Sequence, residues 1–269
     1  MIETGTYFYE GQRRRRRQRI YFKLISVSVF FFALILGGGW LIFRSSFFNV
    51  EKITVLGNKD IKKEEVIGLV KNFILQGSFL RNFLGFENFL AWPKEVGHES
   101  LASLPTLGSL QVKKNYGERS IILTVTEREP FGVLCLKKNL PSECFWFDRE
   151  GVIFKRFFEV EGNLIKSLND YYQENLRLGS KILPEGFIPN LISIFEVINQ
   201  SSLSIKEISL KNLGLQEVEV DTYDGPKIYF SLRFPAENTL AVIQSLLEKT
   251  GFKKLDYLDL RVENRAYYR

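Results

Sequence analysis

The stretch LISVSVFFFALILGGGWLIF, residues 24–43, decides how this chain of 269 residues is organised. Twenty residues of helix at about 1.5 Å each reach roughly 30 Å, the thickness of the hydrocarbon core of a bilayer. Thirteen of the twenty are Leu, Ile, Val or Phe, and no charged residue interrupts them. At about 0.3 to 0.6 kcal/mol each, these side chains favour membrane insertion by roughly 4 to 8 kcal/mol. The sequence therefore predicts a transmembrane helix over residues 24–43.

Two other structures share part of this pattern. A buried core helix would carry a polar face, which a continuous apolar run does not supply. A cleaved signal peptide combines a basic start with a shorter apolar region and small residues before the cut. The sequence FRSS at residues 43–46 is a poor cleavage site. We therefore favour a retained anchor over both.

The charges before this stretch predict its orientation. RRRRRQRIYFK, residues 13–23, contributes seven positive charges, and Glu3 and Glu10 offset two of them. The chain as a whole carries +6, so the part from Leu24 onward nets only +1. Short basic flanks stay in the cytoplasm, and anionic lipid headgroups attract them. We expect an N-terminus in the cytoplasm, contact with membrane lipid, and no nucleic acid as partner, although an arginine run alone also fits nucleic-acid binding.

The two cysteines, Cys135 and Cys144, fall on the far side of the membrane in this topology. The sequence LKKNLPSE between them is typical of a polar turn. A pair that flanks a turn in an oxidising compartment favours a disulfide across a hairpin, with two buried free thiols as the alternative.

The region after the span begins with the pattern of a small α+β domain. Alternating apolar residues predict a strand at 50–56, and a helix follows over 61–71 with Asp60 as its cap. Pro93 opens a second predicted helix over 94–104, and a hairpin follows with strands around 110–113 and 121–125. The order strand, helix, helix, strand, strand predicts a three-stranded sheet with two helices on one face.

Residues 73–92 are unusually aromatic, with Phe73, Phe79, Phe83, Phe86, Phe89 and Trp92. Such a segment is too apolar for an ordinary solvent loop. The simpler interpretation is that this segment packs onto the domain. The more specific interpretation is that it lies at the bilayer interface beside the anchor.

A second, β-rich part begins at Pro130. Strands are predicted at 131–136, 144–147, 205–210 and around 218–220 and 228–232, and helices are predicted from Asn190 and from Pro235. Residues 158–186 give no clear pattern, and two prolines favour an irregular connection there. The last strand starts at 257 and is expected to continue to Arg269.

The sequence offers little for catalysis. His98 is the only histidine, no cysteine cluster accompanies it, and no nucleotide-binding or nucleophile motif occurs. The carboxylate pairs Glu127 with Glu129 and Glu217 with Glu219 could serve a glycosidase, but residues two apart on a strand are common as solvated edges. We expect Asp148 to hydrogen-bond its own turn. We predict no enzyme activity, no cofactor, no metal and no small-molecule substrate.

Several strings, taken in order, resemble the FtsQ/DivIB family of bacterial cell-division proteins. They are the basic tail and single span, FFNVEKITVLGNKDI, VTEREPFGVL, FWFDREGVIF, GLQEVEVDTYDGPKIYF and YLDLRVENRAYYR. The similarity covers nearly the whole chain. Each string alone is weakly specific, and their order and spacing are fairly specific.

The resemblance implies a cytoplasmic tail at 1–23, a transmembrane helix at 24–43, a POTRA domain at 47–129 and the family's β domain at 130–269. It implies a non-enzymatic scaffold in the inner membrane at the septum, linking early and late division proteins. The family's β domain binds a partner of the FtsB/DivIC type, itself paired with FtsL, by adding a strand to the edge formed by the last strand. The matching residues here are Val262, Glu263, Asn264, Arg265, Ala266, Tyr267, Tyr268 and Arg269.

The properties of a terminal strand are consistent with partner binding at this edge. A terminal strand leaves one row of backbone groups open to an incoming strand. Arg265 and Arg269 would complement an acidic partner, and Tyr267 and Tyr268 offer contact area. The other interpretation is an edge that its charges merely guard. Two other functions stay open: a membrane-anchored cell-wall hydrolase or peptidoglycan-binding module, and a POTRA-bearing chaperone or transport component.

Overall fold

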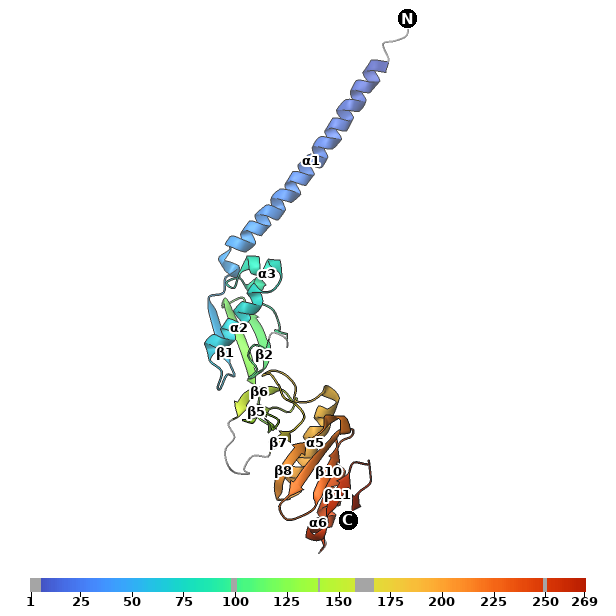
Figure 1. Cartoon of the computed structure of the whole chain (residues 1–269). Coiled ribbons are helices and arrows are strands. Elements are labelled where there is room, and N and C mark those ends of the chain that lie inside the picture. Colours follow the sequence, from blue (N-terminus) through green and yellow to red (C-terminus); the bar gives the residue numbers. More distant parts are fainter. Residues whose placement is uncertain (1–5, 98–100, 140, 158–166, 249–250) are drawn as a thin grey trace. The chain divides into compact units, whose positions relative to one another are not determined.

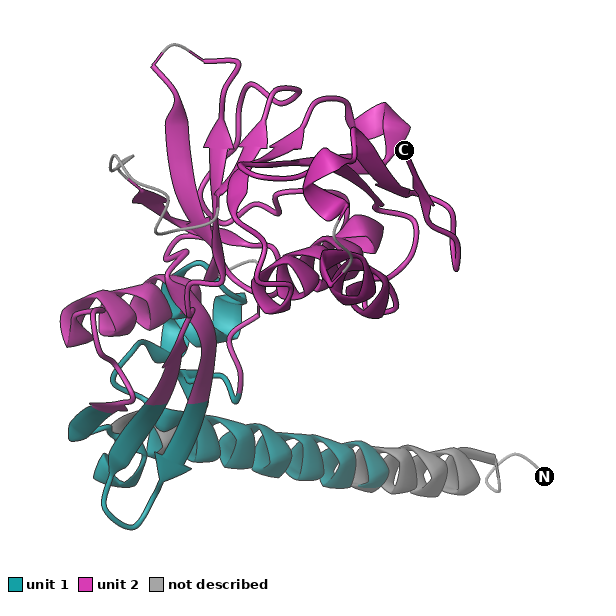
Figure 2. Ribbon diagram, turned by 90° about the horizontal axis from the view of Figure 1, so that it is seen from below, with its two compact units in different colours: residues 1–54, 74–94, 112–123 teal, residues 55–73, 95–111, 124–269 magenta. Residues whose placement is uncertain are grey.

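The computed structural model describes residues 6–97, 101–139, 141–157, 167–248 and 251–269. The fold is α+β, as predicted: an apolar N-terminal helix, a β-α-α-β-β segment and a nine-stranded mixed sheet. Figure 2 colours two compact units, of which one comprises residues 1–54, 74–94 and 112–123, and the other residues 55–73, 95–111 and 124–269. His98 lies outside the described residues.

The N-terminal helix α1 runs from Thr6 to Arg44 and contains the apolar stretch (Figure 1). Its 22 residues from Ile20 to Leu41 have a mean hydropathy of 2.2, and none of them is buried against the rest of the chain. A helix with these properties is long enough to be a single membrane anchor, and a signal sequence at an N-terminus has the same properties.

The β-α-α-β-β segment begins a few residues after α1. Its elements are β1 (Lys52–Leu56), α2 (Lys63–Leu75), α3 (Phe79–Leu84), β2 (Leu107–Asn115) and β3 (Ser120–Glu127), with short 3-10 turns η1 (Ser46–Phe48) and η2 (Phe89–Ala91). The three strands form one sheet in the order β1-β3-β2. The predicted first strand and hairpin are therefore confirmed.

The approach to α2 differs from the prediction. The helix begins at Lys63, so Asp60 is not its cap. The carboxylate of Glu127 instead accepts the backbone N–H groups of Lys59, Asp60 and Ile61, at 2.6, 3.1 and 3.0 Å to Oε1. Three donors on one carboxylate hold this segment in a non-helical turn, which delays the start of the helix.

The predicted second helix over 94–104 is wrong at its start. Glu95 forms a β-bridge with Gln111, and the Val112 N–H donates to the carbonyl of Lys94 at 3.4 Å. Val96, one residue later, is buried. The chain is extended here because the backbone of residues 94–95 pairs with β2; residues 98–100 of the predicted helix lie outside the described residues, and Leu101 is helical.

The aromatic segment 73–92 divides into a buried and an exposed part. Phe89 and Trp92 are buried, and the Trp92 indole N–H donates to the carbonyl of Phe86 at 2.8 Å. The side chains of Phe79, Leu80 and Phe83 are 81%, 68% and 62% exposed. Packing onto the domain therefore explains the end of the segment but not α3.

The second sheet has nine strands in the order β12-β11-β10-β9-β8-β7-β4-β5-β6. The strands are β4 (Gly132–Leu136), β5 (Glu143–Phe147), β6 (Ile153–Phe157), β7 (Ser167–Asp170), β8 (Ile205–Leu210), β9 (Glu217–Thr222), β10 (Lys227–Ser231), β11 (Tyr257–Leu260) and β12 (Tyr267–Tyr268). Three neighbouring pairs are parallel: β4 with β7, β7 with β8, and β10 with β11. The remaining pairs described are antiparallel.

A row of apolar residues crosses six neighbouring strands in register. Its members, each at most 1% exposed, are Leu134, Leu168, Ile208, Val220, Ile228 and Leu258. Helices α5 (Ile188–Gln200) and α6 (Thr239–Leu247) pack on this row. Because side chains alternate between the faces of a strand, the row determines which face of the sheet each remaining residue of these strands occupies.

Both of these helices begin away from the predicted residue. α5 starts before Asn190, whose side-chain amide donates to the Leu232 carbonyl at 2.7 Å instead of capping the helix. α6 starts at Thr239, after Pro235, and the Ala236 N–H before the helix donates to Ser193 Oγ at 2.8 Å. The predicted inward residues of α5, Leu191, Ile194, Phe195 and Ile198, are all buried.

The region predicted as an irregular connection contains a central strand. β7 lies between β4 and β8 in the sheet and contributes Leu168 to the buried row. Only four residues long, it carries one large apolar side chain, so its pattern is too short to read. Part of the same region, residues 158–166, lies outside the described residues.

The prediction that the last strand continues to Arg269 is wrong. β11 ends at Leu260, and the chain turns between Val262 and Arg265, where the Arg265 N–H donates to the Val262 carbonyl at 3.1 Å. Asn264 in this turn has a φ of +57°, a conformation that Asn adopts more readily than most residues. The chain then returns antiparallel to β11 as β12.

Cys135 and Cys144 face each other across β4 and β5 and form a disulfide. They lie on the face of the sheet opposite the buried row, with Val133, Trp146 and Phe157 packed around them.

We expect unreduced full-length chain to take up no alkylating agent under denaturing conditions, and reduced chain to take up two equivalents. Intact mass measures this, and two alkylated thiols without reductant would contradict the disulfide.

The Glu127 carboxylate should stabilise the turn before α2. Burial raises its pKa, but the three backbone hydrogen bonds and the charge of Lys59 outweigh burial, so its pKa is lowered. The stabilisation is therefore present above the unfolded pKa of about 4.3 and is lost as the pH falls through the lower folded pKa. We expect Glu127→Ala to cost about 2 kcal/mol locally, about a thirtyfold loss of protection against hydrogen exchange at Lys59, Asp60 and Ile61.

The matched control is Glu129→Ala, because the Glu129 side chain is 85% exposed and contacts Lys59 only at 3.8 Å. Equal losses of protection in the two variants would contradict the role assigned to Glu127.

Candidate protein-binding edge of the nine-stranded sheet

β12 is the outermost strand at one end of the nine-stranded sheet. Tyr267 pairs with Asp259 and Tyr268 with Leu258. The Arg269 N–H donates to the Tyr257 carbonyl at 3.4 Å, and the Asp256 N–H donates to the Arg269 carbonyl at 2.6 Å. β11 is thus covered on both sides, and β12 forms the edge.

The register determines which backbone groups this edge presents. In a strand, successive residues direct their N–H and C=O groups to opposite sides. Since Arg269 is bonded to β11, the N–H and C=O of Tyr268 point to the side of β12 away from β11. The side chain of Tyr268 continues the buried row, opposite Leu258, but it is 51% exposed. Tyr268 therefore presents its backbone N–H, its backbone C=O and its aromatic ring at the edge.

A cluster around Arg261 lies on the opposite face, beside the edge. Arg261 donates to Asp259 at 2.9 and 2.7 Å and to Glu217 at 2.6 Å. Its guanidinium carbon lies 4.8 Å from the centre of the Tyr229 ring. Asp259, Tyr229 and Tyr267 occupy neighbouring register positions on three strands. The cluster ties β9, β10 and β11 together next to β12.

The charges of this cluster stabilise each other. The hydrogen bond from Arg261 lowers the pKa of Asp259; burial opposes this effect without cancelling it, and the backbone N–H and charge of Arg261 add to it. Hydrogen bonds to Asp259 and Glu217 in turn raise the pKa of Arg261. Asp259 and Arg261 are therefore both charged near neutral pH.

A hollow of about 370 Å³ lies next to the turn before β12. It is lined by the start of α6 and the segment before it, and by Leu260 and residues 262–266. Ala266 packs against the core, whereas Val262 is 46% exposed. The turn before β12 therefore lines a hollow whose walls are partly polar and partly apolar.

The structure brings the eight residues singled out in the sequence to this one edge, but in different roles. Val262 to Arg265 form the turn, Ala266 contacts the core, Tyr267 and Tyr268 form β12, and Arg269 closes the pairing with β11. Sequence reasoning missed the Arg261 cluster and the turn. The alternation of Asp259, Leu260 and Arg261 places both charged residues on one face and could have indicated the Arg261 cluster. The Glu263–Asn264 pair could have indicated the turn.

The carboxylates considered for catalysis have structural partners. Glu127 binds the turn before α2, Glu217 binds Arg261, and Glu219 binds Lys211 at 2.6 Å and Lys227 at 3.2 Å. Asp148 accepts the N–H groups of Glu150 and Val152 at 3.0 and 2.9 Å, so the prediction that it binds its own turn is confirmed.

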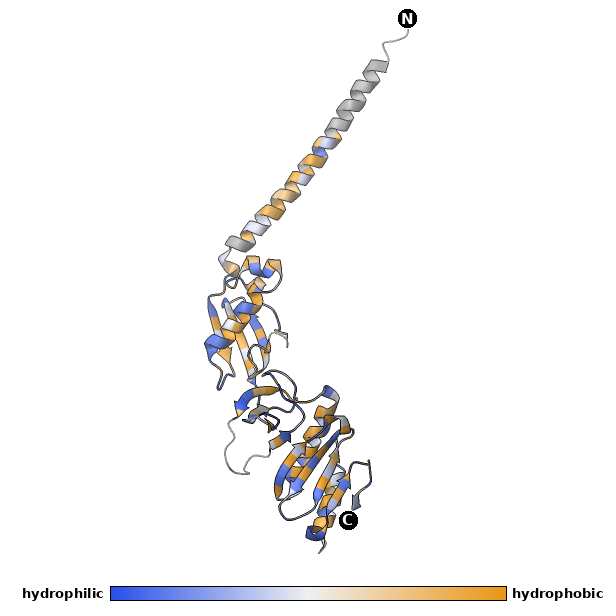
Figure 3. Cartoon of the chain, in the orientation of Figure 1, coloured by the Kyte–Doolittle hydropathy of each residue, from blue (hydrophilic) through white to orange (hydrophobic). Residues whose placement is uncertain are grey.

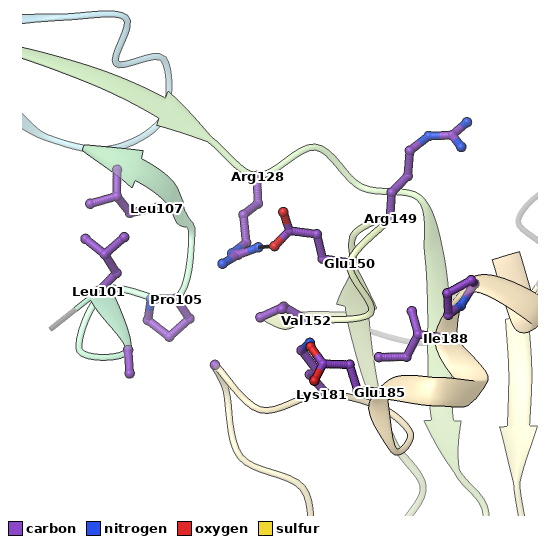
Figure 4. Close-up of a pocket in the computed structure, with 13 residues that line it drawn as sticks. Leu101, Pro105, Leu107, Arg128, Arg149, Glu150, Val152, Lys181, Glu185 and Ile188 are labelled. Atoms are coloured by element: carbon purple, nitrogen blue, oxygen red, sulfur yellow. Dashed lines mark hydrogen bonds and ion pairs between the residues drawn. The ribbon is translucent and has the colours of Figure 1, made fainter. Parts of the chain in front are cut away.

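A larger hollow of about 630 Å³ lies within the unit that contains residues 124–269 (Figure 4). Its apolar wall includes Leu101, Leu107 and Ile188. Each of its three cationic side chains is paired with a carboxylate: Arg128 with Asp148 and Glu150, Arg149 with Glu196, and Lys181 with Glu185.

Comparison with known proteins leaves the family open. No protein-family model matches this chain, and no curated protein matches it.

We expect Arg261→Ala to loosen the edge. It removes the hydrogen bonds to Asp259 and Glu217, and the protection of the Arg269 amide against hydrogen exchange should fall about tenfold. Because the pKa of Asp259 is lowered in the folded chain, the wild-type contribution is present above the unfolded pKa of about 3.9 and fades as the pH falls below it. The variant should lose that pH dependence.

Arg265→Ala is the control, since Arg265 is an exposed arginine on the same edge whose guanidinium donates to the Tyr267 hydroxyl at 3.4 Å and, among the described residues, forms no ion pair. An Arg269 amide that is equally protected in wild type and Arg261→Ala would rule out the stabilising role of the cluster.

Proposed function

We propose that this chain is a single-pass, membrane-anchored scaffold protein of bacterial cell division, of the FtsQ/DivIB type, which acts through protein contacts and not by catalysis. In this proposal α1 is the anchor and residues 47–129, with the order β-α-α-β-β, are a POTRA domain. Residues 130–269 form the domain that binds partners at the septum. The strings of sequence quoted above and the order of the elements support the assignment.

The observation that carries the proposal is the edge at β12. Its outward backbone groups belong to Tyr268, in a strand of two residues that is held in place by β11. A partner strand that pairs there would extend a preformed sheet, so little of the binding energy is spent on ordering this chain. Tyr267 and Tyr268, 46% and 51% exposed, add contact area on the two faces.

The basic tail and the partner fit the same arrangement. Arg13 to Arg17 lie before the apolar stretch, which supports an N-terminus in the cytoplasm and the two later regions outside it. A partner of the FtsB/DivIC type, paired with FtsL, is itself membrane-bound. Two proteins anchored in one membrane meet at a high effective concentration, so a short strand pairing is enough for association.

Tyr268→Pro tests this proposal. Proline lacks the N–H that an added strand would bind, and it is tolerated on an edge strand where that N–H faces outward. We expect the full chain carrying Tyr268→Pro to co-purify at least about tenfold less FtsB/DivIC-type partner when co-expressed with the FtsB/DivIC- and FtsL-type proteins of the same organism.

Tyr268→Val is the matched control, because it also removes the ring but keeps the backbone N–H and a strand-favouring side chain. It should retain most of the binding. Protection of the Arg269 amide in both variants verifies that β12 stays paired with β11. Undiminished co-purification with Tyr268→Pro would contradict strand addition at this edge.

A further inference from the structure

The short helix α3 carries apolar side chains that are largely exposed. Phe79, Leu80 and Phe83 are 81%, 68% and 62% exposed, and the rings of Phe79 and Phe83 stack with their centres 6.0 Å apart. The apolar residue Leu75, at the end of α2, is 43% exposed as well. Single exposed apolar residues are ordinary, but a contiguous group of this size marks an interaction surface.

The segment that carries this surface is tied to the chain just after α1. Asn49 forms a β-bridge with Asn88, and the Val50 N–H donates to the Glu87 carbonyl at 2.8 Å. Only four residues separate Asn49 from Arg44, the last residue of α1, and three of them form the compact turn η1. At about 2 Å per residue in such a turn, the segment is held roughly 10 Å from the end of α1.

Buried and hydrogen-bonded residues that follow α3 hold this segment in place. The carbonyl of buried Phe89 accepts a hydrogen bond from Lys114 Nζ at 2.8 Å, and its ring lies 5.1 Å from that of Tyr116. The Asn88 side chain accepts the Leu90 N–H at 2.9 Å. α3 is thus presented by an anchored loop.

The charged residue within α3 is Arg81, and Glu87 follows three residues after the end of the helix. Residues 72–86 and 39–50 contain no Asp or Glu. Burial lowers the pKa of Lys114, and the neighbouring charges of Lys94 and Arg81 lower it further, which indicates a positive potential around this segment. Anionic lipid headgroups attract such a potential.

We propose that α3 lies in the interface of the bilayer that α1 enters, with Phe79, Leu80 and Phe83 in contact with lipid. This inference rests on the proposed membrane anchor. Figure 3 shows hydrophobic colouring along the apolar part of α1 and again on α3. Aromatic residues favour the interface, and an apolar face with basic neighbours is typical of interfacial helices. Attachment to α1 makes the contact intramolecular, so even a weak affinity keeps α3 on the membrane.

This contact would change what the anchor does. A single helix leaves the domain free to rotate about the helix axis, whereas a second contact with the membrane restricts that rotation. The β-α-α-β-β segment would then present one defined side to the membrane and the opposite side to other proteins.

A fluorophore at α3 tests the inference in the full chain reconstituted in nanodiscs that contain anionic lipid. Cys135 and Cys144 are joined, so Leu80→Cys provides one thiol for an environment-sensitive label. We expect blue-shifted emission, quenching by lipids with a nitroxide near the headgroup, and protection from aqueous iodide. Leu215→Cys is the control, because Leu215 is 60% exposed in the other unit, and its label should be open to iodide.

Two further variants make each outcome decisive. A label at Val29→Cys in α1 should be quenched by lipids with a deep nitroxide, and its failure would overturn the anchor and this inference together. Phe79→Ser with Phe83→Ser should abolish lipid quenching at Leu80→Cys while quenching at Val29→Cys persists. Two results would overturn the inference while α1 is inserted. In one, iodide quenches the label on Leu80→Cys. In the other, neither iodide nor lipid nitroxide reaches the label, as expected if a second protein covers it.

Discussion

One row of buried apolar side chains, from Leu134 to Leu258, sets the geometry on which the rest of the larger sheet depends. The row crosses six strands in register and faces α5 and α6. A slip of one residue in any strand would move its apolar side chain to the opposite face, so the register is strongly specified. The same register runs on through Leu258 to Tyr268 and thereby decides which residue of β12 directs its backbone away from the sheet.

The two faces of this sheet differ in what stabilises them. One face is covered by helices and apolar, and the other carries ion pairs, the disulfide and the Arg261 cluster. The charged face adds little to the core, because exposed ion pairs stabilise weakly, but the Arg261 cluster joins β9 to β11 beside the edge. The edge is therefore held from both faces, which would suit the proposed addition of a partner strand, because the edge is already ordered.

Much of the fold could be predicted from the sequence, because long alternating or amphipathic patterns survive tertiary packing. β8 was expected at the residues where it is found, and the hairpin of β2 and β3 follows its alternation. The failures have local causes. β7 has too few residues to show a period, and the segment at Glu95 pairs with a strand that is distant in sequence. The start of α2 depends on Glu127, more than sixty residues away.

The candidate site was predicted in its residues but not in its shape. The sequence indicated residues 262–269 as an edge, and they do lie at one edge, yet as a turn and a short return strand. The alternation of Leu258, Leu260 and Val262 continues smoothly into the turn, so apolar periodicity alone cannot show where the strand ends. Likewise, aromatic content singled out residues 73–92, but only burial separates Phe89 and Trp92 from the exposed side chains of α3.

We propose that a partner strand is added at Tyr268. Site-specific photo-crosslinking from position 268 of the full-length protein, in the cells that produce it, detects a partner at this position. We expect a covalent adduct with a short, single-pass membrane protein, and no such adduct from position 215, which is exposed and precedes β9, three strands from β12 in the sheet. Adducts of the same protein from position 215 and not from position 268 would contradict the account.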